Sequence, residues 1–140
     1  MTTLRATLGA ALFVAIAAWR PALAQEPPAA PQTAPDSITP ALVALGDSVF
    51  HGRVGRATCF ACHGAKGVGG LAPPLTSGTW LHSDGSYASI VRVVRDGVLK
   101  PSRGPTPMPP MGGVNLTAEQ LRAVAAYVYT LGHQGARAGP

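Results

Sequence analysis

The sequence has few charged residues, only two cysteines, and no long apolar run beyond its first 24 residues. Charged residues make up 12% of the 140, and no stretch gathers charges of one sign. Proteins that bind nucleic acid usually carry a basic stripe or patch, so this class is set aside although the formal net charge is +5. A bilayer span needs about 20 apolar residues in a row. We therefore expect no stable membrane span in the mature chain, which is the part that follows these first 24 residues.

The first 24 residues have the composition of a cleaved secretory signal. Arg5 provides a positive start, residues 8–18 are apolar, and residues 22–24 read Ala-Leu-Ala, as at a cleavage site. An uncleaved signal anchor is the alternative, but an apolar run of about 11 residues is too short to cross a bilayer. The segment has no cysteine that could carry a lipid. We expect residues 1–24 to be removed and the protein to be periplasmic.

The rest of the chain divides into a linker, one domain and a short tail. Residues 25–40 are rich in proline and alanine and poor in large apolar side chains, which predicts a linker. The domain is expected to extend over residues 41–134, with room for one core, and residues 135–140 are expected to be a flexible tail. Two stretches rich in glycine and proline, 64–79 and 97–115, show no pattern. Loops of this length in so small a domain suggest that a large apolar cofactor fills its middle.

Apolar residues at helical spacing predict three main helices. Their expected bounds are 40 to about 52, about 86 to 96, and 117 to a stop at Gly132. Thr39 is the candidate cap of the first. The third begins with a capping box, Thr117-Ala-Glu-Gln120. A strand is the alternative for the second because its residues are often β-branched, but the spacing and a stop at Gly97 favour a helix. The sequence therefore predicts an all-α domain.

Both cysteines lie in one motif, Cys59-Phe-Ala-Cys62-His63. C-x-x-C-H is the pattern of covalent haem attachment: two thiols along one turn each add to a haem vinyl group, and the next side chain reaches the iron. A thioredoxin-like pair would need a βαβ surround, and a zinc site would need further ligands. A structural disulfide would leave His63 and the long loops unexplained. The motif predicts one covalent haem c with its iron.

Together with this motif, residues 41–134 resemble the class I cytochrome c family. Gly46 and Phe50 match the glycine and aromatic of the family's first helix, and Val124 and Tyr127 match their partners on its last helix. The resemblance implies that three main helices and long loops enclose one haem, with the two helices in close backbone contact at the glycine. One departure is the long gap between Phe50 and the motif, which predicts an extra surface loop at 51–58 beside the haem edge.

The resemblance also implies roles for residues outside the motif. In Ala72-Pro-Pro-Leu75, the carbonyl of Pro73 would accept the imidazole N–H of His63, and Leu75 would lie against the haem face. Trp80 is similar to the family's aromatic that donates its indole N–H to a haem propionate, with plain core packing as the alternative.

The second iron ligand implied by the resemblance is a methionine sulfur. Met108 stands directly before a proline and a few residues before the capped last helix, as the family's ligand does, whereas Met111 is expected to pack against the haem or the helix. A flexible Met108, with His82 or water completing the iron, is the alternative. Like His82, the isolated His51 and His133 are expected to be solvated surface groups.

The implied function is electron transfer rather than catalysis. A haem iron with both axial positions filled by protein is left with one-electron exchange. The expected partners are redox proteins: a periplasmic dehydrogenase, a cytochrome complex or a terminal oxidase. The chain would be a free carrier or a dedicated subunit of such a complex; a haem peroxidase or ligand sensor would need a distal His or Arg. Five loop cations are expected to steer an acidic partner: Arg53, Arg56, Lys66, Lys100 and Arg103.

Overall fold

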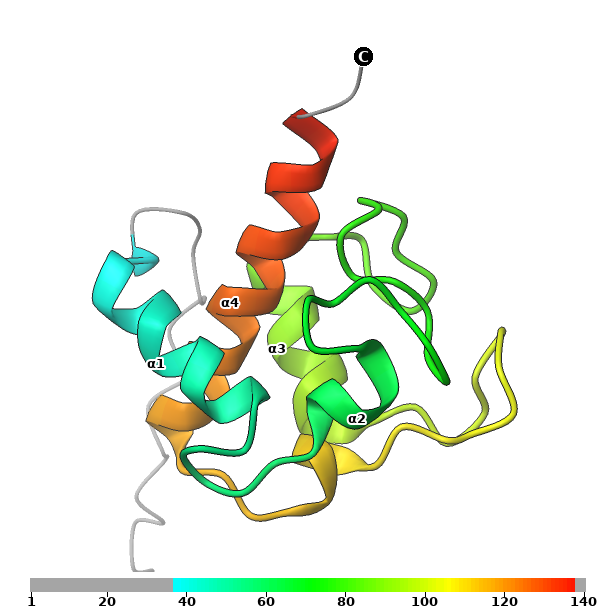
Figure 1. The fold of residues 1–140 in the computed structure, drawn as a ribbon, viewed down its shortest axis with the longest axis horizontal. Helices are drawn as coiled ribbons and strands as arrows, with labels where there is room; N and C mark the ends of the chain where they lie inside the picture. The colour runs from blue at the N-terminus through cyan, green and yellow to red at the C-terminus, as the bar shows by residue number, and fades with distance from the viewer. Residues whose placement is uncertain (1–36, 138–140) are drawn as a thin grey trace, which may run out of the picture. The chain divides into compact units, whose positions relative to one another are not determined.

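A computed structural model describes residues 37–137, with side chains described for 37–134. The expected signal, most of the expected linker and the last three residues lie outside the described residues. The elements are α1 (Pro40–Phe50), α2 (Cys59–His63), α3 (Tyr87–Asp96), the 3₁₀ helix η2 (Pro110–Gly113) and α4 (Ala118–Arg137) (Figure 1). Within residues 37–137 the only β pairing is the isolated bridge between Val98 and Met108. The all-α prediction is confirmed.

The first two long helices begin as the sequence predicts. The Thr39 hydroxyl accepts the backbone N–H of Leu42 at 3.1 Å, which caps α1. The Ser86 hydroxyl accepts the N–H of Ser89 at 3.2 Å, which caps α3. Both side chains satisfy a donor that the first turn of a helix leaves without an intrahelical partner. Gly97 ends α3 with a φ of 70°, as expected.

Helix α4 begins at the predicted capping box but continues past the predicted stop. The Thr117 N–H donates to Gln120 Oε1 at 3.0 Å, and the Gln120 N–H donates to Thr117 Oγ1 at 3.2 Å. The predicted end at Gly132 is wrong, because α4 continues to Arg137 and so includes the start of the expected tail. Glycine at position 132 allows close packing instead. The Cβ atom of any other residue there would lie 2.3 Å from Cζ2 of Trp80, which is too close for two carbon atoms.

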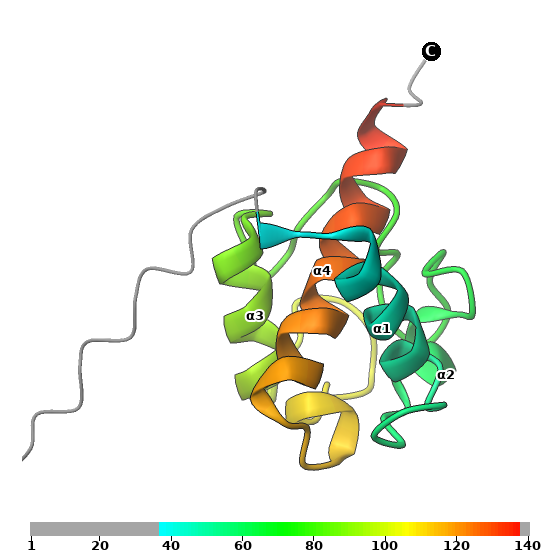
Figure 2. The same ribbon diagram turned by 90° about the vertical axis from the view of Figure 1, so that its left-hand side faces the viewer.

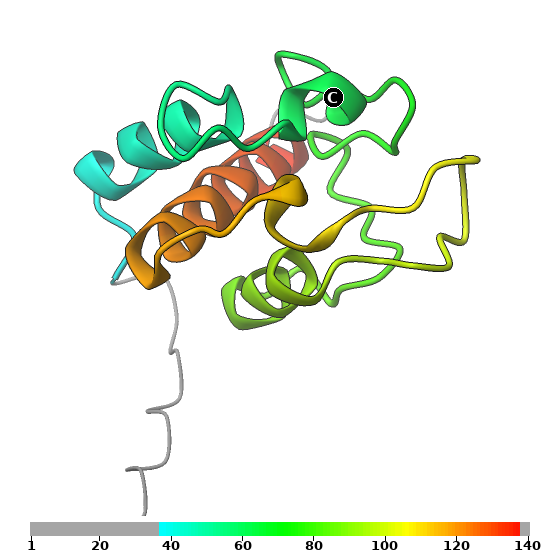
Figure 3. The same ribbon diagram turned by 90° about the horizontal axis from the view of Figure 1, so that it is seen from below.

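The fold is organised around α4, which lies between α1 and α3 (Figures 2 and 3). Helices α1 and α4 cross at Gly46, where an ideal Cβ would lie 2.0 Å from the Ala123 carbonyl oxygen. Only glycine allows two backbones to approach this closely. One turn further along α1, the Phe50 ring packs against Tyr127 with ring centroids 5.3 Å apart. The predicted close crossing is confirmed.

The long loops extend to the same side of the three long helices (Figures 1 and 3). The loop at 51–58 packs more closely than its predicted place on the surface: Ala57 has no exposed surface, and both the N–H and the hydroxyl of Thr58 donate to the Gly112 carbonyl, at 3.3 and 3.2 Å. These bonds fix the start of α2 against η2. Within residues 37–137, no helix combines the length and the apolar character that crossing a bilayer requires.

Candidate cofactor site

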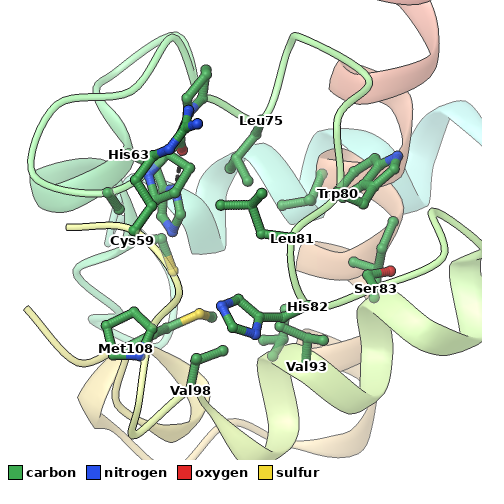
Figure 4. A pocket seen from close by; sticks show the side chains of 18 of the residues that line it. Cys59, His63, Leu75, Trp80, Leu81, His82, Ser83, Val93, Val98 and Met108 are labelled. Carbon is green, nitrogen blue, oxygen red and sulfur yellow. Dashed lines mark hydrogen bonds between the residues drawn. The ribbon is translucent and has the colours of Figure 1, made fainter.

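A large pocket lies between the helices and the long loops, with a volume of about 950 Å³ that includes space open to solvent (Figure 4). Its wall comes from α1, α2, α3 and α4 and from both long loops, as expected of loops that surround a large group. Most of the wall is apolar. Apart from Cys59, His63 and the Trp80 indole, its polar side chains are Thr79, His82, Ser83, Arg103 and Thr106.

Helix α2 carries the attachment motif on a little more than one helical turn. Cys59 and His63 line the pocket, whereas Cys62 does not. Both cysteines are half-buried and no disulfide joins them, so the structure gives no support to the alternative of a disulfide. In the polypeptide before haem is attached, burial raises the pKa of the Cys59 thiol, an effect that its backbone hydrogen bond opposes and the neighbouring Cys62 reinforces.

His63 is held in one orientation by the predicted hydrogen bond. Its Nδ1 lies 3.0 Å from the Pro73 carbonyl oxygen. Because a carbonyl can only accept, Nδ1 carries the proton and the Nε2 lone pair is free to bind a metal. Burial lowers the pKa of His63, and the bond to Pro73 opposes this only in part. The imidazole is therefore held in its neutral, ligating form.

The loop that contains Pro73 is tied to the attachment helix by backbone hydrogen bonds. The Gly69 N–H donates to the His63 carbonyl at 2.8 Å, and the Ala72 N–H donates to the Cys62 carbonyl at 3.0 Å. These bonds hold Pro73 within reach of the imidazole. Leu75, predicted to lie against the haem face, lines the pocket on the same loop.

His51 anchors the same loop to α1, and its predicted place as a solvated surface group is wrong. Its Nε2 lies 2.7 Å from the Ala65 carbonyl oxygen and its Nδ1 lies 2.9 Å from the Asp47 carbonyl oxygen. The ring also stacks on Phe60, with centroids 6.1 Å apart. His133 is half-buried too, stacked on Tyr129 at 3.8 Å. Tyr129 and His133 are four residues apart on α4, so helical spacing brings them together. No local pattern indicates the contact between His51 and Ala65.

Trp80 lines the pocket, but its indole nitrogen does not point into it. An ideal Cβ on Gly85 would lie 2.6 Å from Trp80 Nε1, and Gly132 touches the benzene end of the same edge. Figure 4 shows the nitrogen turned away from His63. This orientation favours the packing alternative, and the donation of the indole N–H to a propionate stays a prediction.

Met108 lines the pocket across from His63 (Figure 4). Its N–H and carbonyl pair with the carbonyl and N–H of Val98, at 3.0 and 2.9 Å, and an ideal Cβ on Gly97 would lie 2.5 Å from its carbonyl oxygen. The glycine thus allows the chain leaving α3 to close against the methionine backbone. Met111 does not line the pocket and adopts a left-handed conformation, with a φ of 52°.

The pocket wall includes two side chains that the sequence analysis named in other roles: His82, a surface group and the alternative to Met108, and Arg103, a steering cation. His82 is exposed, as expected of a surface group, yet it also lines the pocket, and Arg103 is the only permanently charged side chain of the wall. Nothing in the sequence shows that these residues face the motif, because each stands alone in a loop without periodicity.

The wall fits a haem. Its apolar side chains match the faces of a porphyrin, the two thiols lie next to a histidine with a free Nε2, and no carboxylate on the wall would repel the propionates. Cys59, Cys62 and His63 would hold the group from one side, and Met108 lies on the other.

Fold and site together define a c-type cytochrome domain. Residues 51–128 match the family model described as cytochrome c oxidase, cbb3-type, subunit III, which covers more than half of the chain. The chain belongs to this family of cytochrome domains, and it carries a covalently bound haem c with its iron.

Among its relatives is the cbb3-type cytochrome c oxidase subunit FixP of Sinorhizobium medicae (strain WSM419), 37% identical over 93 residues. That match covers 64% of this chain but only 30% of FixP. A solved structure, cytochrome CL from the marine methylotrophic bacterium Methylophaga aminisulfidivorans MPT, superposes with a TM-score of 0.50 at 21% identity. It covers 64% of this chain and 55% of its own, and it bears out the cytochrome c fold.

Proposed function

We propose that this chain is a periplasmic one-electron carrier whose haem iron is ligated by His63 and Met108. One observation carries the proposal: these two side chains reach the same apolar pocket from opposite walls. Thioether sulfur opposite imidazole favours reduced iron and leaves no open position for a small ligand. The expected export signal supports the location.

The chain's own residues would hold and shield the cofactor, which supplies an iron that gains and loses one electron. The Pro73 carbonyl orients His63, and the bridge to Val98 holds the backbone of Met108. The buried apolar side chains of α3 and α4 would keep water from the haem faces. They are Ile90, Val94, Val124 and Val128.

A second candidate is a dedicated subunit of an oxidase or dehydrogenase complex. The family match and the similarity to FixP, an oxidase subunit by name, favour it. The chain spans less than a third of FixP, so the assembly of that protein is not carried over as a whole. Both candidates use the same site and differ only in whether the partner is permanent.

Fractionation of the native periplasmic extract by size tests both the location and the choice between carrier and subunit. For a free carrier we expect covalently bound haem, detected by haem staining after denaturing electrophoresis, to elute at the size of this chain alone. Elution with a large dehydrogenase or oxidase would favour the subunit. Haem that stays with the cells after release of the periplasm would contradict the proposed location.

Reduction by an acidic partner is expected to slow by about tenfold between low and high salt, because loop cations steer the encounter. Arg53 forms an ion pair with Asp47, whereas Arg56, Lys66 and Lys100 are exposed and make no ion pair within the described residues. Screening acts over about 10 Å at 0.1 M salt. Stopped-flow reduction at increasing ionic strength measures the effect.

The matched variants are Lys66→Gln with Lys100→Gln, which should flatten the salt dependence, and Arg53→Gln, which should change it less because this cation is already paired. Reduction rates that do not change with salt would argue against these cations as the docking surface.

A further inference from the structure

His82 lines the same pocket as Met108 but belongs to a different loop. Figure 4 shows its ring reaching into the pocket on the Met108 side, away from His63. An imidazole nitrogen is a strong ligand for haem iron. The wall therefore has two candidate iron ligands on this side of the pocket, a sulfur and a nitrogen.

The His82 ring is hydrogen-bonded to Ser102, which lies in the segment between Val98 and Met108. The backbone N–H of Ser102 donates to His82 Nε2 at 3.1 Å, and Ser102 Oγ lies 3.2 Å from the same nitrogen. Because an N–H can only donate, Nε2 accepts with its lone pair and Nδ1 carries the proton of the neutral ring. A metal would need that same lone pair. The hydrogen bond to Ser102 and coordination to iron therefore exclude each other.

We propose that His82 is a reserve axial ligand, kept from the iron by Ser102, that replaces Met108 when the 99–107 segment is released. The exchange breaks one bond from iron to sulfur and forms one from iron to Nε2, with no change in electron count. The Ser102 N–H then donates its hydrogen bond to water instead of to His82. This inference rests on the proposed ligation by Met108.

The position of Ser102 suits this role. Two backbone hydrogen bonds between Val98 and Met108 join the two ends of the segment between them. Ser102 lies near the middle of this mostly exposed segment. Ser102 is itself exposed, so losing its bond to His82 leaves no buried donor without a partner. The segment can thus detach from His82 at little cost, and the state of one hydrogen bond decides which donor binds.

The decisive variant of the holoprotein is Ser102→Pro, which removes the donating N–H, with Ser102→Ala as its control because alanine keeps that donor. Ser102→Pro should lose most of the weak long-wavelength sulfur-to-iron band of the oxidised protein and show a lower reduction potential. Ser102→Ala should keep both. Adding His82→Ala to Ser102→Pro should restore the band. A band that survives Ser102→Pro, or one that His82→Ala does not restore, would overturn the proposal.

A second pair of variants leaves Ser102 unchanged. Met108→Ala should give the electron paramagnetic resonance spectrum of low-spin iron with two nitrogen ligands, and Met108→Ala with His82→Ala should give high-spin iron that binds added imidazole. Identical spectra for these two variants would show that His82 does not reach the iron. The Met108 assignment is tested separately, by the sulfur band of the wild type.

Discussion

Met108→Ala is expected to abolish the sulfur-to-iron band of the oxidised protein and to lower its reduction potential. Met108 lines the pocket across from His63, and thioether ligation stabilises reduced iron relative to a nitrogen ligand. Absorption spectroscopy and a redox titration of the purified holoprotein measure both effects. The change should not unfold the domain, because the bridge between residues 98 and 108 uses only backbone atoms.

Met111→Ala is the matched control, since these are the only methionines after residue 24. Met111 does not line the pocket, so its replacement should keep both the band and the potential. The opposite pattern would move the ligand to Met111. An unchanged band in both variants would rule out sulfur as its source and reopen the alternative of a haem enzyme.

Gly46→Ala is expected to lower the free energy of unfolding by about 2 kcal/mol. The new Cβ would lie 2.0 Å from the carbonyl oxygen of Ala123, which belongs to the backbone of α4 and cannot rotate away. The two helices must move apart, and the contact between Phe50 and Tyr127 is lost in part. This cost exceeds the gain of about 1 kcal/mol that alanine brings to a helix interior. Urea denaturation of the oxidised holoprotein, followed by circular dichroism, measures it.

Ala44→Gly in the same helix provides the comparison. Ala44 is exposed, so removing its Cβ should cost only the intrinsic helix preference, about 1 kcal/mol. A methyl group should therefore stabilise α1 at position 44 and destabilise it at position 46. A Gly46→Ala variant as stable as the wild type would contradict the close crossing.

The features that the sequence predicted well are local or belong to a recognisable motif. The caps at Thr39 and Thr117 depend on residues three positions away, and the structure contains both. The bond from His63 to Pro73 spans ten residues and was predicted from the family's pattern rather than from the spacing. Such features are encoded in short stretches of sequence, either by local spacing or by a motif that is shared with other members of the cytochrome c family.

The features that were missed depend on contacts between distant segments. The bonds of His51 to Ala65 and of His82 to Ser102 join residues 14 and 20 positions apart in loops without periodicity. Gly132 looked like a helix stop because a glycine near the end of an apolar pattern often is one. In the structure, a glycine is needed at position 132 because the Trp80 ring packs against its backbone, and no local pattern indicates this contact.

The anchoring of His63 has a consequence for the speed of electron exchange. Its ring is fixed by Pro73, and the loop that contains Pro73 is bonded to α2 and, through His51, to α1. A ligand held by so many bonds moves little when the charge of the metal changes. Groups already in place need no rearrangement at the moment of reaction. In electron-transfer terms, an iron ligand held in this way would contribute little to the reorganisation energy, so a small driving force would be enough for rapid exchange with a partner.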